Sequence, residues 1–393
     1  MREREIVIVG ATRTPIGTFG GSLRDMTAIQ LSQFIIESVI KRTGIKKDVV
    51  DQVIMGNCFE PIDHNIARIG LVKAGLPLET TAFHIVATCG SGMQAIISGM
   101  QSISDDNAEC VISGGVESMS TAPYLLTNAR WGMRLQHQLC VDMIWKSMQE
   151  HPIGGGMGMT AETLAEQYGI SREEQDAFAL RSQQCAGRAI KEGRFKDEIS
   201  PVPIPQRKGE LKMYDTDEHP KPEVTMEKLA QLPPAFKKGG TVTAGNSCGI
   251  NDAAAALILM TREKAKALDM KPLGRIVSYA VVGVDPSIMG IGPVPATKKA
   301  LKRAGLKLDD IDLIEINEAF AAQYLACERE LGWNRDIVNV NGSGIALGHP
   351  IGCTGARLVV TLLYEMAKRN LHRGLATLCA GGGQGFALIV ERA

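Results

Sequence analysis

The chain has 393 residues, which is long enough for two or three domains and a large hydrophobic core. Hydrophobic residues make up 45% and charged residues 22%, as in ordinary soluble globular proteins. The 43 basic side chains equal the 43 acidic ones, so no overall basic field attracts nucleic acid or a membrane surface. The nine cysteines form no C-x-x-C pair, which argues against a disulfide framework or a zinc site and favours a reducing, cytoplasmic location.

The beginning of the chain shows no targeting pattern. Its first residues are mostly charged and lead directly into an apolar run at 6–9, unlike a signal peptide or a transit peptide. No stretch approaches the roughly 18 uninterrupted apolar residues of a transmembrane helix. We therefore expect a protein without a membrane span.

The first third of the chain alternates between strand and helix patterns. Strands are predicted at 6–9, 49–55 and 109–112, and helices at 27–40 and 95–103. Gly114 and Gly115 predict the end of the last of these strands. Strands separated by helix-length segments predict right-handed crossovers and a mostly parallel sheet.

The pattern changes between residues 120 and 249, where methionines and prolines accumulate and strand patterns are few. A helical pattern covers 160–191, with Ser171 as a cap within it. We interpret the region as an inserted lid that packs over the first sheet, because strand and helix patterns resume directly after it. A separate domain joined by linkers is the alternative.

The last third repeats the organisation of the first. Strands are predicted at 275–282, 311–316, 375–378 and 386–390, and helices at 296–304 and 357–366. Asn57 lies 32 residues before Cys89, and Asn317 lies 32 residues before His349, in matching strand–turn–helix contexts. This spacing indicates duplicated halves. Because ligands gather beyond the strand ends of open α/β sheets, duplication would bring Cys89 and His349 to one site.

Cys89 stands between an apolar run at 82–87 and a helical pattern, with Gly90 and Gly92 directly after it. A thiol at a helix N-terminus is stabilised as a thiolate by free backbone N–H groups and by the helix dipole. The two glycines allow a sharp turn and the close approach of a ligand. Cys89 is therefore a candidate nucleophile, and a small buried core residue is the alternative.

Three segments in the last third carry further reactive groups. Asn317-Glu318-Ala319-Phe320 follows a strand, glycines surround His349, and Cys379 precedes a run of three glycines. A base, a second thiol and free backbone N–H donors could activate a nucleophile, transfer a proton and bind an oxyanion. Each segment alone has a structural alternative, since lone histidines, glycine turns and core cysteines are common. Jointly the three segments favour an active site.

With these segments in view, the sequence resembles the thiolase family, of the acetyl-CoA acetyltransferase type, over essentially its whole length. Further motifs that carry the resemblance are Arg13-Thr14-Pro15-Ile16-Gly17, Cys89-Gly90-Ser91-Gly92, Gly114-Gly115-Val116-Glu117-Ser118-Met119-Ser120, Thr243-Ala244-Gly245-Asn246 and Gly292-Pro293-Val294-Pro295-Ala296. The resemblance implies an α/β thiolase fold, with two duplicated βαβαβαββ halves in αβαβα layers and an inserted loop domain. The expected first half covers 1–119 and is completed by 250–270, the loop domain covers 120–249, and the second half covers 271–393.

The resemblance also implies a reaction, the reversible condensation of two acetyl-CoA to acetoacetyl-CoA and CoA, within fatty acid metabolism. Cys89 matches the nucleophile that carries the acyl group, His349 the base that activates it, and Cys379 the acid/base at the α-carbon. Asn317 matches the residue that positions a water in one oxyanion hole, together with His349. The backbone N–H groups of Cys89 and Gly381 match the second hole. CoA is substrate and product, and no metal or other cofactor is implied.

The loop domain is expected to carry much of the CoA site. The matching positions for substrate or CoA binding are Met157, Lys221, Ala244, Cys248, Met289, Ala319 and Phe320. Lys221 would face the nucleotide, with a solvent-exposed lysine as the alternative. Met157 and Met289 would line the acyl pocket, with core filling as the alternative.

Several departures from the family pattern bear on acyl-chain specificity. Gly156 stands where many relatives have a histidine, which we expect to leave room near the acyl end. Cys248 replaces a serine and is a weaker hydrogen-bond partner for pantetheine, and the segment 63–68 also departs from the usual pattern. The alternative function is a 3-oxoacyl-CoA thiolase that acts on longer or substituted acyl chains.

Two other classes fit less well. A decarboxylating ketoacyl synthase would have a second histidine in place of the Asn317 segment and a different acid/base from Cys379. A non-catalytic thiolase-like subunit would be expected to lose catalytic residues. Relatives form dimers or tetramers, and residues 124–139 lie where tetrameric relatives extend a loop, so we expect a homo-oligomer and favour a homotetramer.

Overall fold

The computed structural model describes residues 4–60, 62–206 and 209–393. The first half of the fold comprises β1 (Ile6–Arg13), α1 (Ala28–Thr43), β3 (Gln52–Gly56), α2 (Ile66–Lys73), β4 (Thr81–Ile85), α3 (Ser91–Ser104), β5 (Cys110–Ser118) and β10 (Asn251–Thr261). The second half repeats this order with β11 (Gly274–Gly283), α9 (Pro293–Ala304), β12 (Leu313–Ile316), α10 (Ala321–Leu331), α12 (Ile351–Arg369), β13 (Arg373–Ala380) and β14 (Gln384–Arg392). The counterpart of β4 is reduced to a bridge between Val338 and Ile314. The duplication predicted from the matched spacing is therefore present.

An insertion separates β5 from β10. It contains β6 (Tyr124–Leu125), β7 (Val141–Asp142), α4 (Met143–Gln149), α5 (Met157–Tyr168), α6 (Arg172–Lys191), β8 (Val202–Pro205), β9 (Leu211–Tyr214) and α7 (Met226–Ala230). Short elements outside it include β2 (Gly17–Thr18), α8 (Arg262–Ala267) and α11 (Gly344–Leu347). The single helix predicted over 160–191 is two helices, because Gly169 takes a φ of 58° and ends α5. Ser171 then starts α6 through a capping box with Glu174.

The strands of the two halves form one sheet in the order β12-β13-β14-β11-β1-β10-β5-β3-β4, with β2 beside β10, while β6 pairs with β7 and β8 with β9 inside the insertion. Among the described residues, parallel pairing in this sheet joins β3 to β4 and β5, and β12 to β13. The strands between β5 and β13 pair antiparallel. The prediction of a mostly parallel sheet is therefore wrong. In the second half β14 returns directly after β13 without a crossover helix, and such strands pair antiparallel. β10 pairs antiparallel with β5 in the same way in the first half, although the insertion lies between them.

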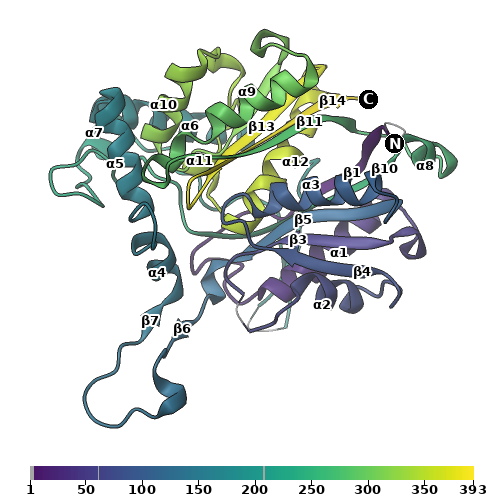
Figure 1. Cartoon of the computed structure of the whole chain (residues 1–393), viewed down its shortest axis with the longest axis horizontal. Helices are drawn as coiled ribbons and strands as arrows, with labels where there is room; N and C mark the ends of the chain where they lie inside the picture. The colour runs from purple at the N-terminus through teal and green to yellow at the C-terminus, as the bar shows by residue number, and fades with distance from the viewer. Residues whose placement is uncertain (1–3, 61, 207–208) are drawn as a thin grey trace.

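Helices cover the outer faces of the sheet and fill the space between its two halves (Figure 1). α3 and α12 pack against each other, and α12 contacts β5 and β10 of the first half and β12 and β13 of the second. Their shared core joins Ile96 and Val359 to Leu257 and Leu388, one from each half of the sheet. α1 and α2 cover the outer face of the first half, and α9 covers the second. This order of layers agrees with the αβαβα arrangement that was expected.

β5 is longer than predicted because its glycines lie inside the strand rather than in a turn. A Cβ at Gly115 would collide with the backbone of Gly352 at the start of α12, and one at Gly114 would collide with the backbone of β10. The two glycines therefore mark close contact with neighbouring elements. Beyond them the strand continues to Ser118 and carries the fully buried Glu117.

The insertion packs mainly on the second half, and not over the first sheet as predicted. α5 and α6 contact α10, and α6 also contacts α11 (Figure 1). Leu164 and Phe178 share a core with Ile316 and Tyr324, and the rings of Phe178 and Tyr324 stack with centroids 3.9 Å apart. The outer face of the first half is already covered by α1 and α2, so the apolar faces of α5 and α6 are buried against the second half.

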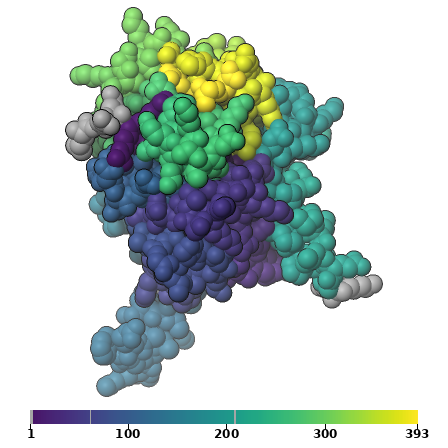
Figure 2. Space-filling view, turned by 90° about the vertical axis from the view of Figure 1, so that its right-hand side faces the viewer, coloured from purple at the N-terminus to yellow at the C-terminus, as the bar shows by residue number. Residues whose placement is uncertain are grey.

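β6, β7 and α4 belong to an arm that extends away from the rest of the molecule (Figures 1 and 2). The side chains of Trp131, Leu135 and Leu139 on this arm are 86%, 86% and 77% exposed. Large apolar side chains gathered on a projecting segment mark a contact surface.

The charged beginning of the chain, residues 1–3, lies outside the described residues. Within the described ranges, no helix combines the length and apolar character needed to cross a membrane.

Candidate active site

The N-termini of α3 and α12 meet between the two halves, and Cys89 and His349 stand just before them. A Cβ at Gly92 would lie 2.9 Å from the carbonyl oxygen of Gly352, so glycines let the two backbones touch. Cys379 is the penultimate residue of β13, which pairs with β12, and Asn317 directly follows β12.

Cys89 is held by a strained turn. Thr88 takes a φ of 49°, which is uncommon for a β-branched residue. Its hydroxyl lies 3.2 Å from the carbonyl oxygen of Gly381. The Ser91 hydroxyl donates to the Thr88 carbonyl at 2.6 Å and accepts the N–H of Ala87 at 2.9 Å. Strain that the surrounding structure maintains is typical of functional sites.

The Cys89 thiol is protonated at neutral pH. Burial raises its pKa to about 11, while hydrogen bonds from the backbone N–H groups of Gly381 and Cys89 act in the opposite direction and Glu117 raises it further. Backbone N–H groups stabilise the thiolate, as predicted, but desolvation outweighs them and keeps the thiol protonated. Cys89 needs a base to become a nucleophile. The two N–H groups beside the sulfur are those that the resemblance assigns to an oxyanion hole.

His349 can supply this base. Burial, and then the charge of Arg357, lower its pKa to about 3, so the imidazole is neutral. Nδ1 lies 2.7 Å from the Thr354 hydroxyl, which itself donates to the carbonyl of Pro350 at 3.0 Å. Thr354 therefore accepts from Nδ1–H, and this assigns the tautomer with a free lone pair on Nε2. Nε2 is buried and has no hydrogen-bond partner among the described residues.

Asn317 is fully buried, and neither polar atom of its amide has a hydrogen-bond partner in the described part of the chain. The adjacent Glu318, by contrast, accepts hydrogen bonds from Asn339 at 2.8 Å and from Ser182 at 2.6 Å. An unsatisfied buried polar group costs about 1–3 kcal/mol, and native proteins keep few of them. The Asn317 amide is therefore positioned for a group from outside the chain.

Cys379 is fully buried. Burial raises its pKa well above the usual value, and the neighbouring thiols of Cys89, Cys327 and Cys248 raise it further. A thiol with a high pKa gives a strongly basic thiolate, which suits proton transfer at carbon. Gly382 and Gly383, with φ of 83° and 82°, then turn the chain into β14.

Five of the predicted substrate-binding residues line one cavity of about 480 Å³, namely Met157, Lys221, Ala244, Cys248 and Phe320. Residues that the sequence analysis missed complete its wall, among them Thr18, Phe19, Met148, His219, Phe236 and Ser247. Met148 lies in α4, Thr18 lies in the two-residue strand β2, and the others lie in loops, so no periodic pattern in the sequence marked them together. Ala319 is buried behind the wall, where its carbonyl accepts the N–H of Cys248 at 3.0 Å. Met289 is buried in the core of the second half and does not line this cavity.

A second cavity of about 290 Å³ shares His219, Lys221 and Ala244 with the first and adds Lys228 and Gln183. Burial lowers the pKa of His219 to about 4, and the charge of Lys221 lowers it further, so this imidazole is also neutral. The backbone N–H of Lys221 donates to the Gln183 side chain at 2.7 Å. The two cavities form an elongated path that is apolar around Phe320 and basic around Lys221 and Lys228.

Gly156 does not open the cavity as predicted. A Cβ at Gly156 would lie 2.8 Å from the carbonyl oxygen of Gln149, so the backbone at the end of α4 occupies the neighbouring space. Met148 and Gln149 line the cavity instead. The expectation of extra room near the acyl end is therefore wrong.

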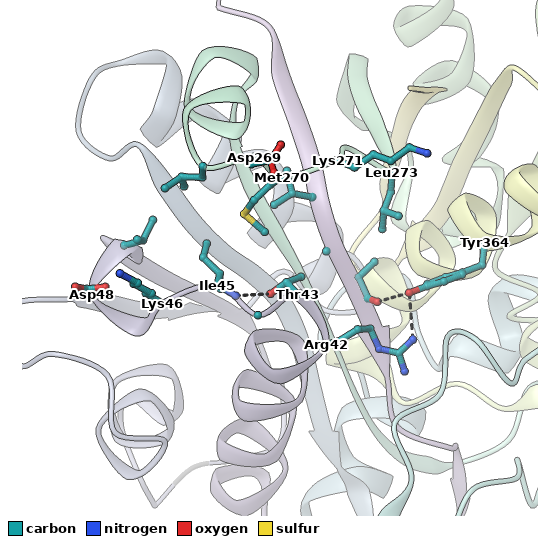
Figure 3. A pocket seen from close by; sticks show the side chains of 16 residues that line it. Arg42, Thr43, Ile45, Lys46, Asp48, Asp269, Met270, Lys271, Leu273 and Tyr364 are labelled. Carbon is teal, nitrogen blue, oxygen red and sulfur yellow. Dashed lines mark hydrogen bonds between the residues drawn. The ribbon is translucent and has the colours of Figure 1, made fainter.

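A cavity of about 680 Å³ lies elsewhere, where the end of α1 and the loop after α8 meet β1 and α12 (Figure 3). Arg42, Lys46 and Lys271 line it, together with Tyr364, whose hydroxyl donates to the Ala11 carbonyl at 2.8 Å. None of the predicted catalytic or substrate-binding residues lines this cavity. Cys89, His349, Cys379 and Asn317 do not line the cavity that Cys248 borders, but the Cys248 thiol interacts with both Cys89 and Cys379, and five predicted substrate-binding residues line that cavity. We therefore place the candidate active site there.

The fold and this site define an enzyme class in which two equivalent α/β halves bring a thiol and an imidazole together. Residues 6–263 match the family model described as thiolase, N-terminal domain, and residues 270–392 match the one described as thiolase, C-terminal domain. The chain belongs to the thiolase family. The predicted fold class and family are thereby confirmed.

Similar proteins cover the chain from end to end. It is 54% identical to an acetyl-CoA acetyltransferase of Syntrophomonas wolfei, over 99% of each chain, and 52% identical to one of Pseudomonas aeruginosa, over 99% of this chain and 100% of the other. The crystal structure of the Bacillus anthracis acetyl-CoA acetyltransferase superimposes with a TM-score of 0.97 at 50% identity over 99% of each chain. Human mitochondrial 3-ketoacyl-CoA thiolase in complex with CoA superimposes with a TM-score of 0.96 at 45% identity, over 99% of this chain and 98% of the other.

Proposed function

We propose that this chain is an acetyl-CoA C-acetyltransferase, which reversibly condenses two acetyl-CoA to acetoacetyl-CoA and CoA through an acyl group on Cys89. The observation that carries the proposal is the contact between the N-termini of α3 and α12, which brings together a protonated thiol and a neutral imidazole with a free nitrogen. The names of the relatives at 54% and 52% identity support acetyl-CoA as the substrate.

In the first half-reaction, Nε2 of His349 accepts the proton of the Cys89 thiol. The thiolate attacks the thioester carbonyl of acetyl-CoA, the new C–S bond forms, and the bond to the CoA sulfur breaks. The backbone N–H groups of Cys89 and Gly381 donate to the carbonyl oxygen as it becomes negative. His349 returns the proton to the departing CoA thiolate.

In the second half-reaction, the neutral His349 imidazole accepts the proton of the Cys379 thiol on Nε2, and the resulting thiolate removes a proton from the methyl group of a second acetyl-CoA. The enolate oxygen is stabilised by a water that Asn317 orients and by the N–H that His349 now carries at Nε2, so both groups gain a partner that the described residues do not supply. The enolate carbon attacks the acetyl group on Cys89, and the Cys89 thiolate leaves. Acetoacetyl-CoA is formed, His349 returns its proton to the Cys89 thiolate, and Cys379 keeps the proton taken from the methyl group.

The elongated path formed by the two cavities is the proposed CoA site. Pantetheine would lie along Met157, Ala244 and Phe320 toward Cys89, and the phosphates and adenine would lie near Lys221 and Lys228. CoA enters as substrate and leaves as product, and the proposed chemistry uses no resident cofactor or metal. The same proposal places the enzyme in the cytoplasm and in fatty acid metabolism.

We further propose that the protein is a homo-oligomer, and a tetramer in preference to a dimer. The projecting arm supports this, because the exposed side chains of Trp131, Leu135 and Leu139 would be covered by other copies of the chain.

Longer or substituted 3-oxoacyl-CoA substrates are less well supported. The sequence argument for them was the room expected beside Gly156, and the backbone of Gln149 occupies that space. Acetoacetyl-CoA is therefore the expected thiolysis substrate.

Thiolysis tests the proposal directly. Purified, reduced protein mixed with acetoacetyl-CoA and CoA should remove the enolate absorbance and form acetyl-CoA, with four-carbon substrate preferred in a panel of longer 3-oxoacyl-CoA esters. Cys89→Ser should abolish turnover and leave no acetyl thioester on the chain by mass spectrometry. Cys140→Ser, at an exposed cysteine of the arm, is the matched control and should keep both. An inactive folded wild type, or an acetyl group on another residue, would contradict the proposal.

A further inference from the structure

Glu117 is a buried carboxylate for which the proposed reaction has no use. Its side chain is fully buried in β5, and in the described part of the chain no lysine, arginine or histidine forms an ion pair with it. Burying an unpaired carboxylate is costly, so such groups are kept where they have a task.

The duplication gives Glu117 a position equivalent to that of Cys379. In the first half Gly56, the residue before Asn57, pairs with Gly115 of β5. In the second half Ile316, the residue before Asn317, pairs with Thr377 of β13. Two residues further along these strands stand Glu117 and Cys379. The fold therefore directs both side chains toward the helix N-termini that carry Cys89 and His349.

The Glu117 carboxylate accepts hydrogen bonds from two parts of the chain, the loop after β3 and the start of α12. Oε1 accepts hydrogen bonds from the Asn57 side chain at 3.0 Å and from the Phe59 N–H at 3.1 Å. Oε2 accepts from the Cys58 N–H at 3.1 Å and from the Gly352 N–H at 2.7 Å. Gly352 lies in the first turn of α12, three residues after His349. The carboxylate thus ties the loop after β3 to the start of the helix that His349 precedes.

The fit around this contact is close. A Cβ at Gly352 would lie 2.8 Å from Oε2 of Glu117 and 2.7 Å from the Cα of Asn57. A Cβ at Gly56 would collide with the backbone of Ser91 and Gly92 in the first turn of α3. A shift of the Glu117 carboxylate would therefore move α12 relative to α3.

Glu117 also acts on its neighbours through its charge. The titratable groups that face it are thiols, Cys58 from the loop after β3, Cys89 before α3 and Cys353 of α12. Its charge raises the pKa of each of them. Burial raises the pKa of Glu117 itself to about 7, while the N–H groups of Gly352, Phe59 and Cys58 lower it, so the group is ionised at mildly alkaline pH.

We propose that Glu117 is a positioning residue of the acyl-transfer site: its carboxylate holds the start of α12, and hence His349, against the turn that carries Cys89. This inference rests on the proposed roles of Cys89 and His349. The proposal gives a role to Glu117, which lies in the motif at residues 114–120 and takes no part in the proposed reaction steps.

Two substitutions separate the two effects. Glu117→Gln removes the charge and keeps the shape, whereas Glu117→Asp keeps the charge and withdraws it by about 1.5 Å, one C–C bond. In Glu117→Gln the pH midpoint for alkylation of Cys89 by iodoacetamide should fall by about half a unit, which is about a threefold faster alkylation at a fixed pH below the midpoint. In Glu117→Asp the midpoint should stay within experimental error of wild type, while kcat for thiolysis falls about 10–100-fold with KM changed little.

Alkylation is followed at Cys89 by peptide mass spectrometry between pH 8 and 11, without substrate, so that it reports on the thiol independently of turnover. Ser113→Ala is the matched control, since Ser113 is a buried polar residue of the same strand whose hydroxyl has no partner among the described residues, and it should leave both readouts unchanged. Circular dichroism and thermal unfolding establish that each variant is folded.

Wild-type kcat in Glu117→Asp would overturn the proposal. If Glu117→Gln does not fold, Glu117→Asp and Asn57→Ala decide the positioning role, because both retain the charge and should lower kcat, and wild-type kcat in both would overturn it. Thiolysis that survives Cys89→Ser would instead contradict the proposed function. The two failures are therefore distinguishable.

Discussion

The two halves of the chain place an asparagine at the same point of the same fold, and they treat it in opposite ways. Asn57 donates to Glu117 at 3.0 Å and to the Val116 carbonyl at 3.1 Å, and its own oxygen accepts the N–H of Glu60. Asn317 has no hydrogen-bond partner for either polar atom among the described residues. In the first half, which we call closed, the amide of Asn57 is satisfied by groups of the protein. In the second half, which we call open, the amide of Asn317 has no partner in the described part of the chain. Duplication supplied two equivalent positions, and substrate chemistry is expected where the protein does not satisfy its own donors and acceptors.

The largest expected effect comes from the cysteine of the open half. Cys379→Ser should lower kcat for thiolysis by about 10²–10⁴-fold, because the hydroxyl is a far weaker acid than the thiol it replaces. Transfer of the acetyl group from acetyl-CoA to Cys89 should persist, since that step does not involve the α-carbon. Mass spectrometry of the protein after a brief exposure to acetyl-CoA measures it. Loss of the acetyl-enzyme in Cys379→Ser would contradict the proposal that Cys89 alone carries the acyl group while Cys379 acts only at the α-carbon.

The pair of asparagines tests the comparison itself. Asn317→Ala should lower kcat about 10²–10³-fold and leave the free energy of unfolding unchanged or slightly higher, because no protein hydrogen bond is lost. Asn57→Ala should reduce the free energy of unfolding by about 1–3 kcal/mol, because Glu117 and the Val116 carbonyl each lose one donor. Urea unfolding and thiolysis on the same preparations give both quantities. Equal losses of stability in the two variants would show that the two asparagines contribute equally to folding, and would contradict the difference between the closed and open halves.

The tautomer of His349 can be tested through the hydroxyl that holds it. Thr354→Val removes the acceptor of Nδ1–H while keeping the size of the side chain, and should lower kcat about tenfold by freeing the ring to rotate or change tautomer. Thr354→Ser keeps the hydroxyl and should restore most of the activity. The kcat/KM of both variants for acetoacetyl-CoA measures the effect. Full activity in Thr354→Val would remove this hydrogen bond from the mechanism.

The pH dependence of stability tests the charge state of His349. The pKa of His349 is about 3 in the folded chain and about 6.5 in the unfolded one, so the unfolded state binds an extra proton between these values. The free energy of unfolding should therefore fall with falling pH, by about 1.4 kcal/mol per unit for this histidine below pH 6.5. His349→Asn should lose that slope, while the contribution of His219, whose folded pKa is about 4, remains. Urea titrations at pH 7, 6, 5 and 4 provide the comparison, and an identical slope in His349→Asn would show that the imidazole is not held neutral.

Much of the local structure could be predicted from the chain. The capping box at Ser171 and Glu174, the strand at residues 275–282 and the helix after Cys89 all follow from patterns within a few residues. Predictions failed where distant segments meet. Gly114 and Gly115 look like a turn, but they lie in mid-strand because α12 and β10 press against them.

The chain by itself determined the duplication, because the spacing from Asn57 to Cys89 recurs from Asn317 to His349, and it determined the family through motifs that extend over its whole length. Only the tertiary structure decided the charge state of the groups in the site. Burial keeps the Cys89 thiol protonated and the His349 imidazole neutral, against what the helix terminus alone would favour. The reason is that desolvation depends on everything packed around a group, and that packing joins residues hundreds of positions apart.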